Sequence, residues 1–353
     1  MIEVEHLSKI YGNTAAIADV TFGVESGEIL GFLGPNGAGK TTTMRILTGY
    51  LPATAGTAKV AGYDIHTDSM AVRQRIGYLP ETPPLYPEMT IEGFLHFVAQ
   101  IKGISAGDRA HRVETAMAKT NLLDRRQTLI RKLSKGYRQR VGIAQAIVHD
   151  PPVIILDEPT VGLDPRQIIE VRNLIKNLAG DHTVILSTHI LPEVSMTCNR
   201  VAIINKGRVV ATNTPTELMA QMAGGAGYEL EIEGDLAHIQ QALQPLPSVK
   251  SVEAIATELP TEFCQVRVAS EPGHTLMGKD LAGAIVAAGL GLHEMRRVQV
   301  TLEKVFLELT TEEPDAAPTE ADSAIANATA APSEPTASDR PDPAEPNAPE
   351  EDA

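Results

Sequence analysis

The 353-residue sequence contains little cysteine, few aromatic residues and no long apolar run. Its two cysteines, Cys198 and Cys264, are too few for a disulfide framework, which is typical of a reducing cytosol, and we predict that both are small buried apolar residues. No uncharged stretch reaches about 18 residues, so we expect no transmembrane helix. The N-terminal MIEVEHLSKIYG has acids at positions 3 and 5 and no apolar core, so we expect no signal peptide. These absences predict a cytoplasmic protein that needs a separate membrane subunit for any membrane role.

Positive charge is also scarce. The sequence has 30 Lys+Arg against 45 Asp+Glu, a net charge of −15, which argues against nucleic-acid binding through bulk charge. Residues 311–353 alone hold 12 acids, one base and eight prolines, so their net charge is −11, whereas residues 1–310 have a net charge of −4. The acidic segment has almost no large apolar residues to offset the entropy of ordering. We predict a disordered tail that acts either as a solvating segment or as an acidic recruitment segment.

A second boundary follows from the glycines of GGAGY at 224–228, which predict a flexible break. The predicted parts are 1–222, a smaller domain at 228–310, and the acidic, Pro/Ala-rich tail at 311–353. The smaller domain alternates strand, helix, strand, strand, helix and strand, the βαββαβ order of a ferredoxin-like α+β fold. A short amphipathic helix, TLEKVFLELT, ends it. The role of this smaller domain is dimerisation, regulation or docking, and the sequence does not choose among these.

A glycine-rich loop, GPNGAGKTT at 34–42, lies between a predicted buried strand (EILGFL) and a predicted helix (MRILTG). In this context backbone N–H groups turn toward a phosphate at a helix N-terminus, so a chance match is the weaker explanation. We expect Lys40 to reach the β and γ phosphates, Thr41 to offer its hydroxyl to Mg²⁺, and Thr42 to contact the α phosphate. The candidate nucleotide-binding residues of the loop are Gly34, Pro35, Asn36, Gly37, Ala38, Gly39, Lys40, Thr41 and Thr42.

The segment VIILDE at 153–158 predicts a central parallel strand that ends in two acids. Ligands of open α/β sheets bind at the carboxyl ends of strands. Asp157 would hold Mg²⁺, and Glu158 would orient or deprotonate an attacking water. Two ordinary acids at a strand end are the alternative, which the glycine loop makes improbable.

Further motifs resemble one family. LSKGYRQR at 133–140 resembles the signature motif of ATP-binding cassette (ABC) proteins, whose common form is LSGGQ. GLDP at 162–165 resembles their D-loop, STH at 187–189 their switch histidine, and IGYLPE at 76–81 their Q-loop, while Tyr11 matches the aromatic residue of their A-loop. The motifs occur in the family's order across residues 1–215. The resemblance implies an α/β P-loop ABC ATPase domain with a helical subdomain at 1–222.

The resemblance also implies roles. Tyr11 would stack on adenine, and His189 would contact the γ-phosphate. In this family the signature motif of one cassette closes over the nucleotide of another, so Ser134 and Gly136 would act in trans, together with Asp164 of the D-loop. One cassette per chain then predicts a homodimer. The function implied is Mg²⁺-dependent ATP hydrolysis coupled to export by a separate membrane permease, with the chain held at the inner face of the cell membrane through that permease.

Two departures from the family pattern affect this site. Lys135 and Tyr137 replace a glycine and a glutamine in the signature motif, and Glu81 stands where many members have glutamine. Whether Glu81 is a Mg²⁺ ligand or only a coupling residue stays open. Basic residues surround the signature motif, and we interpret them as facing a partner's phosphates rather than nucleic acid. They are Arg125, Arg126, Arg131, Lys132, Lys135, Arg138 and Arg140.

The segment after Glu81 combines a proline-rich turn with an amphipathic helix. IGYLPE…PLYPEMT is similar to subunits of ABC-2-type exporters, and that similarity makes Leu85, Tyr86 and Phe94 candidate contacts for a permease. Packing within the helical subdomain is an equal alternative. The rival functions are a mechanical ATPase acting on ribosomes or DNA, and a nucleotide-sensing regulator with little turnover.

Overall fold

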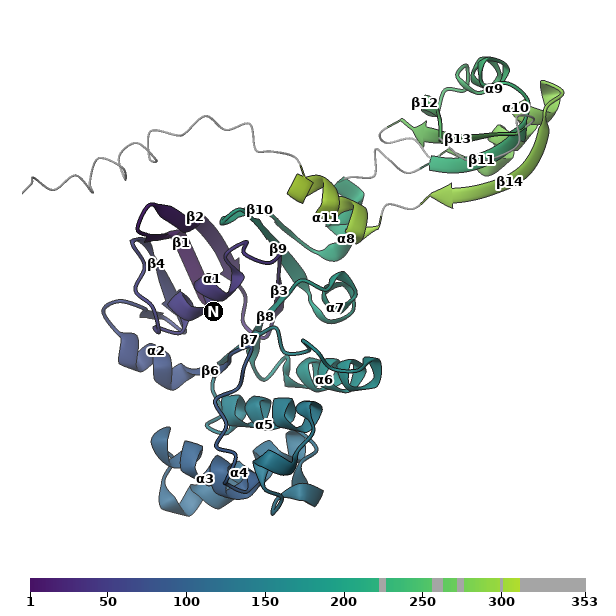
Figure 1. The fold of residues 1–353 in the computed structure, drawn as a ribbon. Coiled ribbons are helices and arrows are strands. Elements are labelled where there is room, and N and C mark those ends of the chain that lie inside the picture. The colour runs from purple at the N-terminus through teal and green to yellow at the C-terminus, as the bar shows by residue number, and fades with distance from the viewer. Residues whose placement is uncertain (222–226, 256–262, 272–275, 299–300, 312–353) are drawn as a thin grey trace, which may run out of the picture. The chain divides into compact units, whose positions relative to one another are not determined.

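The apolar strands predicted from the sequence form one six-stranded sheet (Figure 1). The computed structural model describes residues 1–221, 227–255, 263–271, 276–298 and 301–311. Neighbours in this sheet pair in parallel, except that edge strand β10 pairs antiparallel with β9. In spatial order its strands are β10 (Arg208–Asn213), β9 (Arg200–Asn205), β3 (Ile29–Leu33), β8 (Thr183–Thr188), β7 (Val153–Asp157) and β6 (Ile76–Leu79). Every residue of β3, β7 and β8 is buried, as expected for parallel strands covered on both faces.

The register of the three central strands brings the predicted motifs to one edge of this sheet. Leu33 at the end of β3 is opposite Thr188 of β8, and Asp157 at the end of β7 is opposite Ser187. The glycine loop, the two acids and the STH motif therefore leave the sheet side by side at its carboxyl edge.

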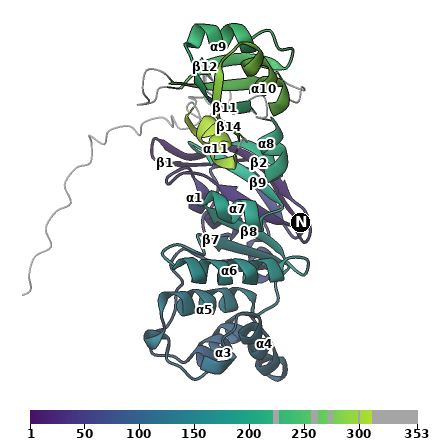
Figure 2. The same ribbon diagram turned by 90° about the vertical axis from the view of Figure 1, so that its right-hand side faces the viewer.

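An antiparallel sheet and several helices complete the cassette. The sheet has the order β2 (Thr14–Val24), β1 (Ile2–Tyr11), β4 (Ala55–Val60) and β5 (Tyr63–Asp64), and it shares a core with α1. α3, α4 and α5 form the helical subdomain, and α5 lies beside α6 (Figures 1 and 2). The helices are α1 (Lys40–Leu47), α2 (Ser69–Arg75), α3 (Ile91–Ile101), α4 (Ala106–Lys119), α5 (Lys135–Ile147), α6 (Pro165–Leu178), α7 (Leu191–Thr197) and α8 (Pro215–Gln221).

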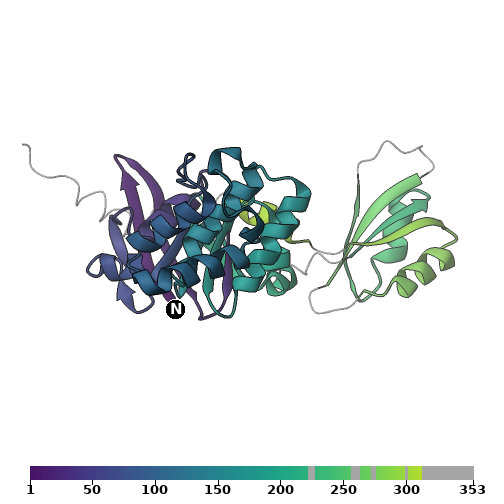
Figure 3. The same cartoon turned by 90° about the horizontal axis from the view of Figure 1, so that it is seen from below.

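The smaller domain has the strand order of a ferredoxin-like fold. Its antiparallel sheet runs β12 (Val249–Ala254), β13 (Phe263–Ser270), β11 (Gly227–Glu233) and β14 (Gly291–Val298). The helices α9 (Leu236–Leu243) and α10 (Gly278–Ala287) cover one face of it (Figure 3). Ile232, Val266, Ile239 and Ile285 are completely buried in the core between them. The predicted βαββαβ order is therefore present in the described part of the chain.

The amphipathic helix that follows, α11 (Leu302–Thr311), shares a core with the cassette instead of with the small sheet. Leu302 and Val305 are buried against α7, α8 and β9, and α11 lies beside α8 in Figure 1. The Asn205 side chain donates hydrogen bonds to the carbonyls of Leu309 and Thr310, which are end groups of α11 that no helical bond satisfies.

Side-chain packing corrects the expectation for the cysteines and decides between the two alternatives left open for Phe94. Cys198 and Cys264 are half-buried against apolar cores, not fully buried. Phe94 is 1% exposed within the core of the helical subdomain and offers no surface to a partner, whereas Tyr86 is 53% exposed. The predicted tail beyond Thr311 and the glycines at 224 and 225 lie outside the described residues. Within the part of the chain that is described, no helix is long and apolar enough to cross a membrane.

Candidate nucleotide-binding site

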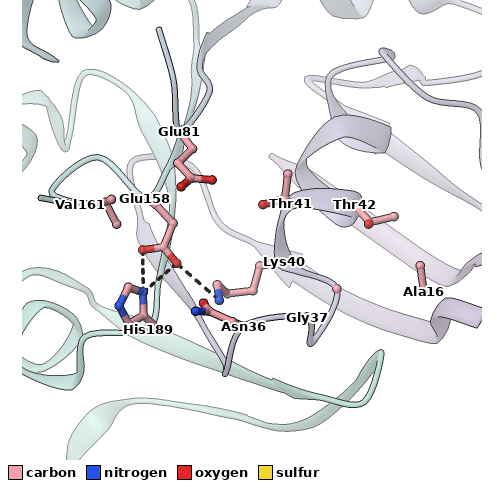
Figure 4. A pocket seen from close by; sticks show the side chains of 11 residues that line it. Ala16, Asn36, Gly37, Lys40, Thr41, Thr42, Glu81, Glu158, Val161 and His189 are labelled. Carbon is pink, nitrogen blue, oxygen red and sulfur yellow. Dashed lines mark hydrogen bonds and ion pairs between the residues drawn. The ribbon is translucent and has the colours of Figure 1, made fainter. Parts of the chain in front are cut away.

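A cavity of about 430 Å³ opens at the carboxyl edge of the central strands (Figure 4). Most of the motif residues predicted for catalysis or nucleotide binding line it. They are Asn36, Gly37, Gly39, Lys40, Thr41, Thr42, Glu81, Glu158 and His189. Ala16 and Val161 also line the cavity, and the sequence motifs did not point to either of them. The fold therefore brings segments from five parts of the chain around one space.

The loop after β3 depends on glycine at two points. Gly39 has φ 107°, and a Cβ atom there would lie 2.5 Å from Ile17 Cγ2 and 2.8 Å from the Ala16 carbonyl oxygen. Gly34 has no room either, because a Cβ atom would meet the backbone of Ile204. A loop this close to neighbouring strands keeps its backbone N–H groups at the cavity, where they suit an anion.

Lys40, the first residue of α1, is 6% exposed and bonds across its own loop. Its ammonium donates to the carbonyl oxygens of Gly34 at 2.8 Å and Pro35 at 3.2 Å. It also lies 3.4 Å from Oε1 of Glu158. The cation is thus fixed at the cavity by two dipoles and one carboxylate, in reach of a phosphate bound to the loop.

Glu158 is the residue after β7, and its backbone leaves the strand direction there with φ 49°. This left-handed conformation is strained for a residue with a side chain. Its N–H donates to the carbonyl of Ser187 at 3.1 Å and to the Ser187 hydroxyl at 3.2 Å. Its carboxylate lies 2.9 Å from His189 Nδ1 through Oε2, so it is held between an imidazole and the Lys40 ammonium (Figure 4).

Asp157 is completely buried, and its two oxygens differ. The Ser187 hydroxyl donates to Oδ1, whereas Oδ2 has no hydrogen-bond partner among the described residues. Burial raises the pKa of the neighbouring Tyr78 to about 12, and the charge of Asp157 adds to that rise. An unpartnered buried carboxylate oxygen is costly unless a ligand such as a cation meets it.

These residues fit a magnesium ion that is held jointly with phosphates. The described residues contain no group of three or more His, Cys, Asp or Glu side chains that holds a metal by itself. Mg²⁺ in nucleotide sites usually takes one or two protein ligands and fills the rest with phosphates and waters. Asp157 Oδ2, the Thr41 hydroxyl and Glu81 supply oxygen ligands of the appropriate kind.

Seven predicted nucleotide-binding residues do not line this cavity, although all of them are described. Three of them, Gly34, Pro35 and Ala38, belong to the glycine loop, and the other four come from other motifs. Tyr11 ends β1 and is 49% exposed. Ser134 caps the N-terminus of α5 by accepting from the N–H of Tyr137, and Asp164 caps α6 by accepting from the N–H of Gln167. A Cβ atom on Gly136 would lie 2.6 Å from Gln167, so the starts of these two helices are packed together.

The two replaced positions of the signature motif have specific contacts. The centre of the Tyr137 ring lies 4.5 Å from the guanidinium carbon of Arg125 and 5.5 Å from that of Arg140, and Arg140 also pairs with Glu170. The Lys135 ammonium lies where a Cβ atom on Gly162 would be, so it covers the D-loop. Several members of the basic cluster are thus already paired or stacked within the chain.

The family model for ABC transporters matches residues 17–161. The linearmycin resistance ATP-binding protein LnrL of Bacillus subtilis is 30% identical over 311 residues, which are 88% of this chain and 98% of that protein. The Nod factor export ATP-binding protein I of Ralstonia nicotianae is 34% identical over 315 residues, 89% of this chain and 94% of that protein. A solved ATP-binding subunit of an ABC transporter is 33% identical and matches with a TM-score of 0.58, covering 63% of this chain and 93% of that one.

The chain belongs to the ATP-binding subunits of ABC transporters. Its cassette is the P-loop ABC ATPase fold that the motifs predicted, it binds ATP, and it is an ATPase. Subunits of this family dimerise and work with membrane permeases.

Proposed function

We propose that this chain powers an ABC-2-type exporter as a homodimer that binds ATP with Mg²⁺ and works at the inner face of the cell membrane through a separate permease. The observation that carries the proposal is the carboxylate of Glu158, held between Lys40 and His189 in a cavity bordered by the phosphate loop. The names of the two relatives, a resistance protein and an export protein, support the direction of transport.

In the proposed site the loop N–H groups and Lys40 bind the β and γ phosphates of ATP, and Thr42 contacts the α phosphate. Lys40 is bound to loop carbonyls and to Glu158, so binding of the γ phosphate exchanges part of these contacts for a phosphate oxygen. That exchange frees the carboxylate of Glu158 to take a hydrogen bond from water.

Glu158 then orients the attacking water and accepts its proton, and His189 holds the carboxylate and contacts the γ phosphate. Asp157, Thr41 and Glu81 are the residues that would hold Mg²⁺. A Mg²⁺ ion held there would supply Lewis-acid chemistry that offsets negative charge on the phosphates. Each of these roles is assigned to a side chain that lines the cavity or, for Asp157, ends the strand beside it.

The dimer is proposed because Ser134, Gly136 and Asp164 lie outside the chain's own cavity. They flank the starts of two adjacent helices, where N–H groups favour an anion such as the γ phosphate of a second subunit. Tyr11, at the end of β1, is proposed to stack on the adenine ring. Tyr86 packs edge-on against Phe97 at 5.5 Å, and these two exposed rings, with half-buried Leu85, are the proposed permease contact.

The test compares the purified protein with Lys40→Ala and Glu158→Gln. We expect Glu158→Gln to lower Mg²⁺-dependent phosphate release by roughly 100-fold or more while ATP still binds. Lys40→Ala should weaken ATP binding itself, as measured by equilibrium titration. Undiminished hydrolysis in both variants would overturn the proposal.

Light scattering of ATP-bound Glu158→Gln tests the dimer, since a monomer at all concentrations contradicts it. Co-purification from membranes tests the permease, and it should recover an ABC-2-type subunit.

A further inference from the structure

The residue that carries this inference is Glu193, in the first turn of α7, four residues after His189. Its side chain is 3% exposed, and no motif of the sequence pointed to it. We propose that Glu193 is a positioning residue that ties the segment bearing Glu158 to the segment bearing His189. The inference rests on the proposed function, because it concerns how those two groups are held for ATP hydrolysis.

The carboxylate of Glu193 bridges Thr160, in the turn after β7, and Thr188, the last residue of β8. The Thr160 hydroxyl donates to Oε1, and the Thr188 hydroxyl donates to Oε2 at 2.8 Å. Thr160 follows Glu158 by two residues, and Thr188 directly precedes His189. Both threonines are buried, at 3% and 0% exposure. One carboxylate therefore fixes both segments within a few bonds of the two proposed functional side chains.

This bridge lies beyond the last pair of the β7–β8 ladder, which joins Asp157 to Ser187. One further backbone hydrogen bond joins the two segments, from the Glu158 N–H to the Ser187 carbonyl at 3.1 Å, and Glu158 itself has a left-handed backbone conformation. Glu193 adds a side-chain link between the residues that follow this bond. The backbone N–H of Ile190 also donates to the Thr188 hydroxyl at 3.0 Å, which orders the turn between His189 and α7.

The chemistry of the bridge differs from that of a residue that only fills space. A buried carboxylate loses its hydration, and no cation of the described residues pairs with Glu193. An apolar side chain would pack between α7 and the sheet without this cost. Two oxygens that accept from two separate segments give a fixed distance between them, which an apolar side chain does not provide.

The experiment measures kcat, KM for ATP and the thermal midpoint of the full-length protein carrying Glu193→Ala, Glu193→Gln, Thr160→Val or Thr188→Val. We expect Glu193→Ala to lower kcat by roughly 10- to 100-fold, because displacing a reacting group by about 1 Å has an effect of this size. The equilibrium affinity for ATP should stay unchanged within about threefold, since the bridge touches no residue of the phosphate loop. Glu193→Gln keeps the volume and one acceptor oxygen, and its NH2 group can donate to the other threonine hydroxyl, so the variant should retain kcat within roughly threefold.

Each valine variant cuts one arm of the bridge at constant volume and should lower kcat by itself. Adding Thr188→Val to Glu193→Ala should lower kcat little further, because Glu193→Ala has already removed the hydrogen bond that Thr188→Val would break. The matched control is Glu217→Ala. Glu217 is also an acid in the first turn of a short helix and accepts from a threonine hydroxyl, that of Thr214 at 2.8 Å, but it is exposed and does not line the cavity. It should leave kcat unchanged.

A folded Glu193→Ala protein with the original kcat, or one whose ATP affinity falls in proportion to kcat, would overturn the inference. If Glu193→Ala does not fold, the two valine variants decide, and unchanged kcat in both overturns it equally. Glu158→Gln is measured in parallel. If it abolishes hydrolysis while the Glu193 and valine variants do not, only the positioning role fails; if it has no effect, the proposed function itself fails.

Discussion

His189 Nδ1 lies 2.9 Å from Oε2 of Glu158, although the two residues follow different strands and belong to different motifs. Neither residue is on the phosphate loop, yet Lys40 of that loop contacts the other oxygen of the same carboxylate. The three side chains form one chain of polar contacts across the mouth of the cavity (Figure 4). The effect of a substitution near Lys40, Glu158 and His189 therefore depends on which of the contacts that hold these side chains it removes.

Gly39→Ala should disrupt the phosphate loop. The new Cβ would lie 2.5 Å from Ile17 Cγ2, at φ 107°, so both the contact and the backbone conformation are unfavourable. We expect ATP affinity to fall at least about tenfold, which corresponds to about 1.4 kcal/mol. Gly62→Ala is the control, because Gly62 has φ 82° with nothing within 4 Å of its Cβ position. Equal ATP affinities in the two variants, by titration, would contradict the prediction.

Tyr137→Leu should lower stability by about 1 kcal/mol, because it removes the ring beside Arg125 and Arg140. Tyr137→Phe keeps the aromatic face and should leave stability nearly unchanged. Urea unfolding of both variants measures the difference. A Phe variant as unstable as the Leu variant would show that the hydroxyl, not the ring face, matters.

Val305→Ala should loosen α11 from the cassette. Val305 is 1% exposed in the core formed with α7, α8 and β9, so its truncation should cost about 1–3 kcal/mol. Limited proteolysis should then cut near α11 sooner than in the unmodified protein. Leu307→Ala, on the same helix but 55% exposed, is the control and should have little effect. Equal cleavage rates for the two variants would argue against this docking.

His149 should make the protein less stable in mild acid. Burial, followed by the charge of Lys102, lowers the pKa of His149 from 6.5 to about 4. As pH falls through this window the unfolded chain binds a proton at His149 and the folded chain does not, so the free energy of unfolding falls. The free energy of unfolding at pH 5 should be about 2 kcal/mol lower than at neutral pH. The stability is complete above pH 6.5 and falls progressively between pH 6.5 and about 4.

The measurement for His149 is urea unfolding at pH 7 and pH 5. His149→Gln keeps an N–H donor for the Ile76 carbonyl, which His149 meets at 3.1 Å, and it should reduce the pH dependence. His111→Gln, at an exposed position, is the control. An unaltered pH dependence in His149→Gln would show that other groups carry it.

The sequence by itself determined the class of this protein and most of its local chemistry. The glycine loop, the strand VIILDE and the STH motif each consist of contiguous residues, so their conformation and their place at strand ends follow from local pattern. The ABC ATPase fold, confirmed by the family match, follows from the order of these motifs. The roles of the individual site residues and the Mg²⁺ ion stay predictions.

Only the tertiary structure decided which side chains meet. Val161 and Ala16 line the cavity, Glu193 bridges two threonines, and α11 shares its core with the cassette, all through contacts between segments distant in sequence. The similarity to exporter subunits offered Phe94 as a candidate permease contact, with packing inside the helical subdomain as the alternative. The structure decides for packing, because Phe94 is buried against α4 and α5, whereas Tyr86 is exposed. Periodicity along one element predicts which of its faces is buried, but it does not say which side chains from distant segments meet there, because that depends on how the elements pack against one another.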